Sequence, residues 1–299
     1  ATFSGTFDGN RKMIQNLRLK GTSCSLFGDV VGDADRTEPQ IADFSVVNAA
    51  LHPTGQGQCA LLASSTLQHV GIENVHVFGL LADDEAFSGS FGGLVGTASV
   101  YTTIAGCSVN DARVSLPHAA VAGGIAAQLR TSSAISACKV SGTLRADNTL
   151  GGIVGEVYEN GSLCTVADNH VSADLEAQHT LGGIAGSDNH NLITHNYAEV
   201  TLTATGGDKW NGPCTGGIAG SLDEGMPAGV KRNVVGLRSL SSVASEVPEN
   251  RPAVAYETTH RVVGKTTYNI YGDKGDEGIA DNYVLGTVAP ISDATVYAG

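Results

Sequence analysis

The sequence predicts an all-β fold, a right-handed parallel β-helix (β-solenoid) of about nine coils with three short strands in each coil. Three observations predict this fold. Two repeating patterns run in phase through the chain, the repeat length is close to 30 residues, and the composition combines 39 glycines with only 5% aromatic residues. Self-similarity at such a period is typical of solenoids, in which each repeat stacks on the next.

The first pattern is an aliphatic residue, a second marker three residues later and, usually, another aliphatic residue two positions beyond that. Nine copies occur. They are Ile14/Leu17/Leu19, Ile41/Phe44/Val46, Ile72/Val75/Val77, Ile104/Cys107/Val109, Ile135/Cys138/Val140, Val166/Asn169/Val171, Ile193/Asn196/Ala198, Val230/Asn233/Val235 and Ile279/Asn282/Val284.

The second pattern is a glycine pair followed by two aliphatic residues and, usually, another glycine. It reads FGGLVG at 91–96, LGGIVG at 150–155, LGGIAG at 181–186 and TGGIAG at 215–220, with VAGGIAA at 121–127 as a variant. A glycine pair would cost roughly 1 kcal/mol per residue inside a helix, so these segments are expected to be strands and corners. The hand of the crossovers is expected to be right-handed, as in most parallel connections.

Residue parity locates a corner inside each coil. Alternate residues of a strand face the same side, so a straight strand cannot bury both Ile104 and Cys107. We therefore predict a bend at the two residues between each first member and its marker. The asparagines at the marker position are expected to form an inward amide ladder there, because Asn tolerates turn geometry and can bond its stacked neighbours. They are Asn169, Asn196, Asn233 and Asn282.

The repeats span the chain, so residues 1–299 are expected to form a single β-solenoid domain. An N-terminal coil and cap is expected at 1–30 and a C-terminal coil at 279–299. Longer steps between repeats predict insertions at 203–214 and 238–278.

Charge and hydropathy exclude two classes of partner. The net charge of −13 and the 17 scattered Lys and Arg argue against nucleic acid, which needs a basic stripe to bind phosphates. No apolar run approaches the length of a membrane span, so membrane insertion is not expected. The chain has no signal-peptide pattern, and we expect a mature protein or a segment of a longer one.

The glycine elements resemble the GLUG motif, a repeat of bacterial IgA-specific metallopeptidases and adhesin-like surface proteins. The opening FSGTFDGNRKMIQNLRL at 3–19 is similar to the start of such modules, with Arg11 where the family usually has Gly. NVVGL at 233–237 and HRVVG at 260–264 resemble the ends of these arrays. The metallopeptidases carry an HExxH zinc helix outside their repeats, and this chain has no HExxH among its nine histidines.

Six cysteines are present: Cys24, Cys59, Cys107, Cys138, Cys164 and Cys214. An even number in an exported protein is compatible with disulfides. However, Cys24/Cys59 and Cys107/Cys138 occupy equivalent places in successive coils, where side chains about 4.8 Å apart point the same way. A ladder of small buried thiols is therefore the favoured interpretation.

Two loops are candidates for ligand contacts. Trp210, the only tryptophan, lies in the glycine-rich segment GGDKWNGPC and either contacts a sugar or protein or covers the side of the coil. Asp273, Asp276 and Glu277 offer oxygen ligands for calcium but lack calcium-loop spacing, so solvated loops are the simpler interpretation. No other cofactor is expected.

One catalytic candidate remains. The corner column contains Asp168, His195 and Arg232 on successive repeats, which is an acid, a base and a cation in a row. β-Helix enzymes that act on polysaccharides place such groups on adjacent coils, although corner residues of a solenoid are more often only solvated.

Taken with the repeat fold, the GLUG resemblance implies a non-catalytic extracellular or cell-surface module of a larger secreted bacterial protein, adhesin-like or accessory to a host-targeting protease. Its expected partners are a host glycan or protein and further domains of the same polypeptide. A carbohydrate-active β-helix enzyme, of the polysaccharide lyase or glycoside hydrolase type, is the alternative, and a spacer without any ligand is the third possibility.

Overall fold

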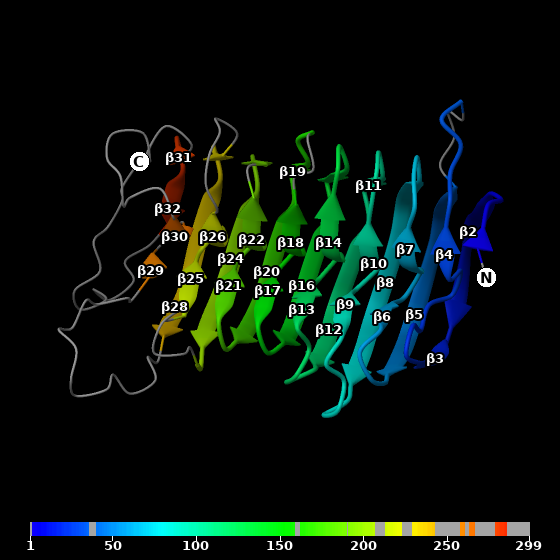
Figure 1. Ribbon diagram of the computed structural model, residues 1–299, viewed down its shortest axis with the longest axis horizontal. Helices are drawn as coiled ribbons and strands as arrows, with labels where there is room; N and C mark the ends of the chain where they lie inside the picture. Colours follow the sequence, from blue (N-terminus) through cyan, green and yellow to red (C-terminus); the bar gives the residue numbers. More distant parts are fainter. Residues whose placement is uncertain are drawn as a thin grey trace.

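The computed structural model describes residues 2–35, 40–158, 162–189, 191–206, 213–222, 229–242, 258–260, 263–266 and 279–285. The strands wind into an all-β parallel β-solenoid of about seven turns with three parallel sheets. Figure 1 shows the turns side by side as one elongated stack, with the N-terminal turn at one end. Among the described residues, no helix is long and apolar enough to cross a membrane.

Counted over the described residues, sheet A has nine strands in the order of the turns, sheet B has sixteen and sheet C has seven. They are β1 (Thr2–Phe3), β4 (Asp29–Val30), β7 (Ala63–Thr66), β10 (Val95–Ala98), β14 (Ala126–Arg130), β18 (Val154–Tyr158), β22 (Ala185–Asn189), β26 (Ala219–Leu222) and β30 (Val263–Thr266). Sheet C has seven short strands. They are β6 (Gln58–Ala60), β9 (Ser90–Gly92), β13 (Val121–Gly123), β17 (Thr149–Gly151), β21 (Thr180–Gly182), β25 (Cys214–Gly216) and β29 (Thr258–His260).

Sheet B has sixteen strands because most turns contribute one strand on each side of a corner. The strands are β2 (Phe7–Gln15), β3 (Arg18–Gly21), β5 (Ile41–Pro53), β8 (Gly71–Asp83), β11 (Thr103–Ala105), β12 (Ser108–Ser115), β15 (Ala134–Ser136), β16 (Lys139–Arg145), β19 (Thr165–Ala167), β20 (His170–Ala177), β23 (Leu192–Thr194), β24 (Tyr197–Ala204), β27 (Val230–Lys231), β28 (Val234–Ser242), β31 (Ile279–Ala280) and β32 (Tyr283–Leu285).

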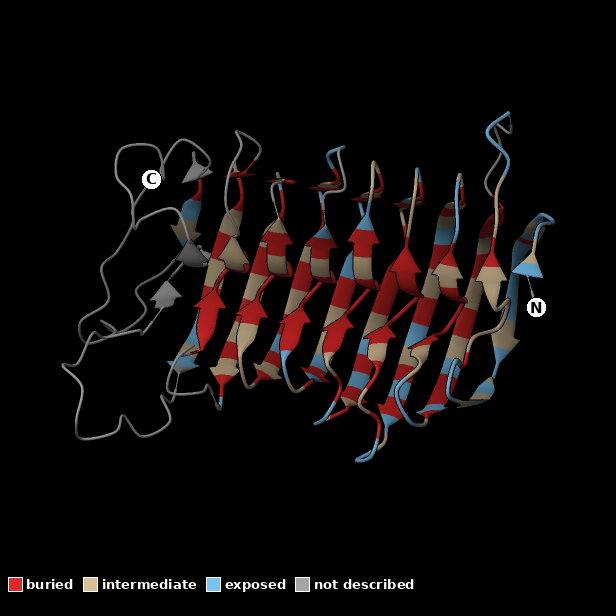
Figure 2. Ribbon diagram, in the orientation of Figure 1, coloured by how far each residue is buried: buried red, intermediate tan, exposed pale blue. Residues whose placement is uncertain are grey.

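The first members of the repeat form a continuous interior column. Ile104 pairs with Ile72 on one side and Ile135 on the other, and Ile135 pairs with Val166 in the following turn. All four side chains are fully buried. Figure 2 shows the resulting alternation of buried and less buried residues along the strands. The predicted stacking of repeats is therefore confirmed, since a turn can bury its apolar residues only against its neighbours.

The predicted corner is also confirmed. The residue two positions after the first member has a positive φ in eight successive turns, between 53° and 63°. These residues are Asp43, Asn74, Gly106, Ala137, Asp168, His195, Arg232 and Asp281. This left-handed conformation turns the chain so that residues three apart can both point inward, and it suits Asn, Asp and Gly better than Ala, His or Arg.

The glycine pairs allow a close approach between sheets C and A. A Cβ atom on Gly92 would lie only 1.8 Å from the carbonyl oxygen of Val95, and one on Gly93 would lie 2.0 Å from the carbonyl oxygen of Gly124. Any side chain here would collide with backbone of the same corner or of the next turn, so the second sequence pattern marks this tight corner.

The predicted amide ladder is present and buried. The Asn169 side-chain amide and backbone N–H both donate to Oδ1 of Asn196, at 3.0 Å each. Asn196 bonds Asn233 in the same way, at 3.0 and 2.9 Å, and Asn233 bonds Asn282. Each amide also donates to a carbonyl of the preceding turn, as Asn196 does to Val166 at 2.9 Å. Each turn from Asn169 to Asn282 is therefore hydrogen-bonded to the next turn at the corner.

The first repeat was assigned the wrong register. The structure pairs Phe7 with Ile41 and Ile14 with Val46, so Ile14 is a third member rather than a first member. A register shift between Asp8 and Lys12 separates the two pairings. Sheet C moreover begins only at β6 and contributes seven strands, so about seven turns are built from all three sheets, not nine.

The two expected insertions overlap strands at their ends. β24 continues to Ala204 and β28 to Ser242, while β29 and β30 fall within 238–278. The remaining parts of the insertions include residues outside the described ranges.

Candidate functional site

The candidate row of Asp168, His195 and Arg232 lies on three successive turns. These residues follow β19, β23 and β27, whose strands pair in parallel and in register. Their φ values are 59°, 55° and 56°, and all three side chains are exposed. The structure thus brings together the three residues that the sequence placed in one column.

The row has few contacts that would tune its chemistry. Nδ1 of His195 lies 3.0 Å from the hydroxyl of Thr194, and Nε of Arg232 lies 3.9 Å from the carboxylate of Asp281 in the following turn. The Arg232 and Asp281 side chains are 65% and 66% exposed, so solvent screens this ion pair. A catalytic role for the row stays a prediction.

The other ligand candidates cannot be placed. Trp210, Asp273, Asp276 and Glu277 lie outside the described residues. Within the described part of the chain, no group of three or more His, Cys, Asp or Glu residues is arranged to hold a metal ion.

The expectation of thiols throughout is wrong for the first cysteine pair. Cys24 and Cys59 form a disulfide whose Cα atoms are 4.8 Å apart. Parallel stacking brings two equivalent Cα atoms within the range that a disulfide spans, and the shared direction of the side chains does not prevent the bond. The bridge joins two neighbouring turns of the stack.

Cys107 and Cys138 stack in the same way and remain thiols, buried at the corner before β12 and β16. Contact with the Cys138 sulfur, followed by burial, raises the pKa of Cys107, whereas the contact with Cys107 lowers the pKa of Cys138. The opposite directions belong to one coupled pair of thiols, in which Cys138 loses its proton before Cys107 does.

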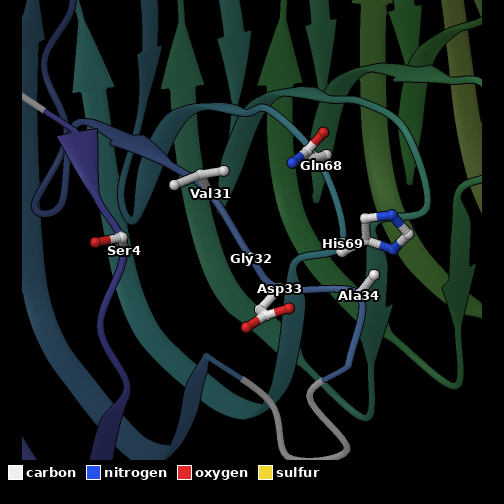
Figure 3. A pocket seen from close by; sticks show the side chains of 7 residues that line it. All are labelled: Ser4, Val31, Gly32, Asp33, Ala34, Gln68 and His69. Carbon is white, nitrogen blue, oxygen red and sulfur yellow. The ribbon is translucent and has the colours of Figure 1, made fainter.

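A pocket of about 410 Å³ opens near the N-terminal end, where loops leave sheet A. Figure 3 shows Ser4, Asp33 and His69 lining it from three separate segments. The His69 ring stacks on Tyr101 of the next turn, with centroids 4.9 Å apart and planes 13° apart. Oδ1 of Asp33 accepts the backbone N–H of Asp35. In the described part of the chain, no hydrogen bond joins the side chains of the seven lining residues to one another.

A second cleft, of about 330 Å³, lies on the outer face of sheet B and was missed by sequence reasoning. We call it the Arg18–Arg113 cleft. Its lining residues are Arg18, Asn48, Ala49, Ala50, Gly79, Leu80, Leu81, Asp111 and Arg113. They come from four successive turns, because Arg18 pairs with Ala50, Ala50 with Leu81 and Leu81 with Arg113.

A second column of left-handed residues shapes this cleft. Asn16, Asn48, Gly79 and Asp111 have φ values of 55°, 56°, 76° and 53°. This bend lies in the middle of β5 and β8, where the first pattern contains no signal. The available signal was a second change of parity, because inward residues three apart, such as Val77 and Leu80, flank the small or polar residue at these positions. Sequence reasoning did not extend the parity argument that far along the strand.

Comparison with known proteins adds no relative to this description: no family model, no curated protein and no solved structure matches the chain. What is established is therefore the β-solenoid fold.

Proposed function

We propose that this chain is a non-catalytic extracellular scaffold and binding module, of the GLUG-motif type, within a larger secreted or surface bacterial protein. Its role is adhesin-like or accessory to a host-targeting protease. The glycine pairs at the tight corner between sheets C and A support the GLUG resemblance, because they recur in the same structural place in successive turns.

The observation that carries the scaffold role is the unbroken parallel pairing of the turns. Ile72, Ile104, Ile135 and Val166 stack through the interior, and the amide ladder continues the stack from Asn169 to Asn282. A solenoid bonded at every turn is a stiff spacer, and it holds its outward loops at fixed distances for recognition.

The disulfide between Cys24 and Cys59 supports export. Structural disulfides persist in oxidising compartments and outside the cell, and they are rare in the reducing cytosol. The acidic net charge of −13 also suits a soluble surface module that does not bind nucleic acid.

The test is to screen the chain against a glycan array and a panel of host glycoproteins including IgA, and to incubate every ligand that binds with the protein at high concentration. We expect binding without any cleavage product. Release of shortened glycan or peptide would contradict the scaffold role, and absence of all binding would leave only the spacer role.

A carbohydrate-active enzyme is the second candidate, because Asp168, His195 and Arg232 stack on adjacent turns. If the screen detects cleavage, Asp168→Ala and His195→Ala should each abolish it, whereas Ala137→Ser in the same corner column should not. Retained cleavage in both alanine variants would exclude this row as the catalytic site.

A further inference from the structure

We propose that the Arg18–Arg113 cleft binds an extended, acidic segment of a partner polypeptide in which two carboxylates flank one apolar side chain. The proposal rests on the function proposed above and deepens it, because it assigns the binding surface and the chemistry of the partner.

The charges at the two ends of the cleft are the first argument. The guanidinium of Arg18 is held in place by donating to the backbone carbonyls of Asn48, at 2.9 Å, and Leu17, at 3.2 Å. Arg113 is exposed and has no hydrogen-bond or ion-pair partner among the described residues. In a chain with a net charge of −13, this cleft therefore presents two guanidinium groups to a ligand, and Arg pairs well with carboxylates.

The floor between the arginines is apolar. Leu81 is 44% exposed and lies between Ala50 and Arg113 in the same column. Outside the cleft, across the bend at Gly79, Phe78 is also 44% exposed, and it pairs with Val47 of the neighbouring turn. Exposed Phe and Leu together with Arg are typical of the centre of a protein–protein interface rather than of a solvated sheet face.

The spacing of these groups selects an extended peptide. Three turns separate Arg18 from Arg113, which corresponds to roughly 14 Å at the spacing of parallel strands. In an extended chain, residues i and i+4 face the same side and lie about 13–14 Å apart. A strand along the solenoid axis can thus place acidic residues at i and i+4 over the two arginines and an apolar residue at i+2 over the floor between Ala50 and Leu81.

The width of the cleft argues against a helix. The bend at Asn48, Gly79 and Asp111 lines one side of the cleft, and only a single outward column, Ala50 and Leu81, lies between the arginines. A helix with its side chains is about 10 Å across, wider than a floor of one residue per strand. Asp111 lines the same cleft and opposes an acidic ligand, so its charge is expected to weaken binding.

The test uses the whole chain and a fluorescein-labelled peptide, Ser-Glu-Ser-Leu-Ser-Glu-Ser, whose two glutamates are four residues apart. Binding is measured by fluorescence anisotropy at low salt. We expect Arg113→Ala to weaken binding about ten-fold, since it removes a charge-assisted contact, and Asp111→Asn to strengthen it. Leu81→Ser should weaken it independently. Arg130→Ala, which removes an exposed arginine from sheet A, should leave it unchanged.

Three control peptides of the same length sharpen the result. Exchanging glutamate for lysine, placing the two glutamates side by side or exchanging leucine for serine should each weaken binding. Circular dichroism of every variant checks that it is folded. The proposal would be overturned if the peptide with adjacent glutamates bound equally well or if Arg113→Ala left the affinity unchanged. It would also be overturned if an acidic oligosaccharide, but not the unlabelled peptide, displaced the labelled peptide. Ligands found in the glycoprotein screen would then still support the binding-module function at another surface.

Discussion

The corner that follows the first member of each repeat, inside sheet B, is built differently in the two halves of the solenoid. In the N-terminal half the inward residue after the bend is Phe44, Val75, Cys107 and Cys138 on successive turns, and in the C-terminal half it is always asparagine. The backbone is the same in both halves, because the preceding residue has a positive φ throughout. The difference shows how one backbone corner accepts two kinds of side-chain contact.

The thiols imitate part of what the amides do. The sulfur of Cys138 lies 3.7 Å from the carbonyl oxygen of Ile104, just as the amide of Asn169 lies 3.1 Å from that of Ile135. The Cys107 side chain and, to a smaller extent, its N–H lower the pKa of Cys138. In the next turn the N–H of Cys138 donates to Oδ1 of Asn169. A thiol is a weak donor and a weak acceptor, so the same contacts are weaker in the cysteine turns.

The largest expected effect comes from breaking the ladder in its middle. Asn196→Ala removes the acceptor of both Asn169 donors and leaves the Val166 carbonyl without its amide donor. We expect the free energy of unfolding to fall by about 4 kcal/mol, because buried polar groups lose their partners. Urea denaturation measures it. The exposed Asn148→Ala is the control and should change it by less than about 0.5 kcal/mol; equal losses in both variants would contradict a stabilising role for the ladder.

Replacing the amide by a thiol tests whether cysteine is a partial substitute. Asn196→Cys should cost about 2 kcal/mol, less than Asn196→Ala, since the thiol retains weak versions of both contacts. The same denaturation experiment compares the two. If Asn196→Cys lowered the free energy of unfolding as much as Asn196→Ala, the thiol would not replace the contacts of the amide. Cysteine and asparagine would then resemble each other at this corner only in side-chain size.

The reverse exchange extends the ladder by one turn. In Cys138→Asn, the new Oδ1 can accept the N–H of Cys107 and the new amide can donate to the Ile104 carbonyl. We expect stabilisation by about 1 kcal/mol, measured as a higher urea midpoint at constant slope. A clear loss of stability would show that the N-terminal half is packed for sulfur and cannot accommodate the amide.

The smallest effect concerns the bend itself. Ala137 has a φ of 53°, where the equivalent residue of the preceding turn is Gly106. Ala137→Gly should stabilise the protein by about 0.5 kcal/mol, because relief of the left-handed strain slightly exceeds the entropy cost of glycine. Ala134→Gly, within β15, should instead destabilise it. Thermal unfolding of the two variants, with midpoints moving in opposite directions, checks the argument.

Sequence reasoning located the corner because parity requires it. Ile104, Cys107 and Val109 cannot all face inward without a bend, and the structure has Gly106 at that bend with a φ of 63°. The same reasoning failed in the first turn, where the register shift between Asp8 and Lys12 breaks the periodicity that aligned the other copies. It also missed the bend at Asn48 and Gly79, although Val77 and Leu80 are both buried and three residues apart, which is a second change of parity that the argument did not pursue.

Of the candidate sites, one could be predicted from the sequence and one was missed. A column such as Asp168, His195 and Arg232 follows from the period alone, because equivalent residues of a solenoid always stack. The Arg18–Arg113 cleft was not predicted, although its two arginines also stand in one column of paired residues. The wrong register of the first turn moved Arg18 out of that column.

The sequence by itself determined the winding, the tight glycine corner and the interior columns, because each depends on a short local pattern that recurs at a nearly constant period. Tertiary structure alone decided that Cys24 and Cys59 are bonded while Cys107 and Cys138 are not, where the first turn begins its register, and which outward side chains share a cleft. Those outcomes depend on distances of a few ångströms between side chains of different turns, and a linear period does not specify such distances.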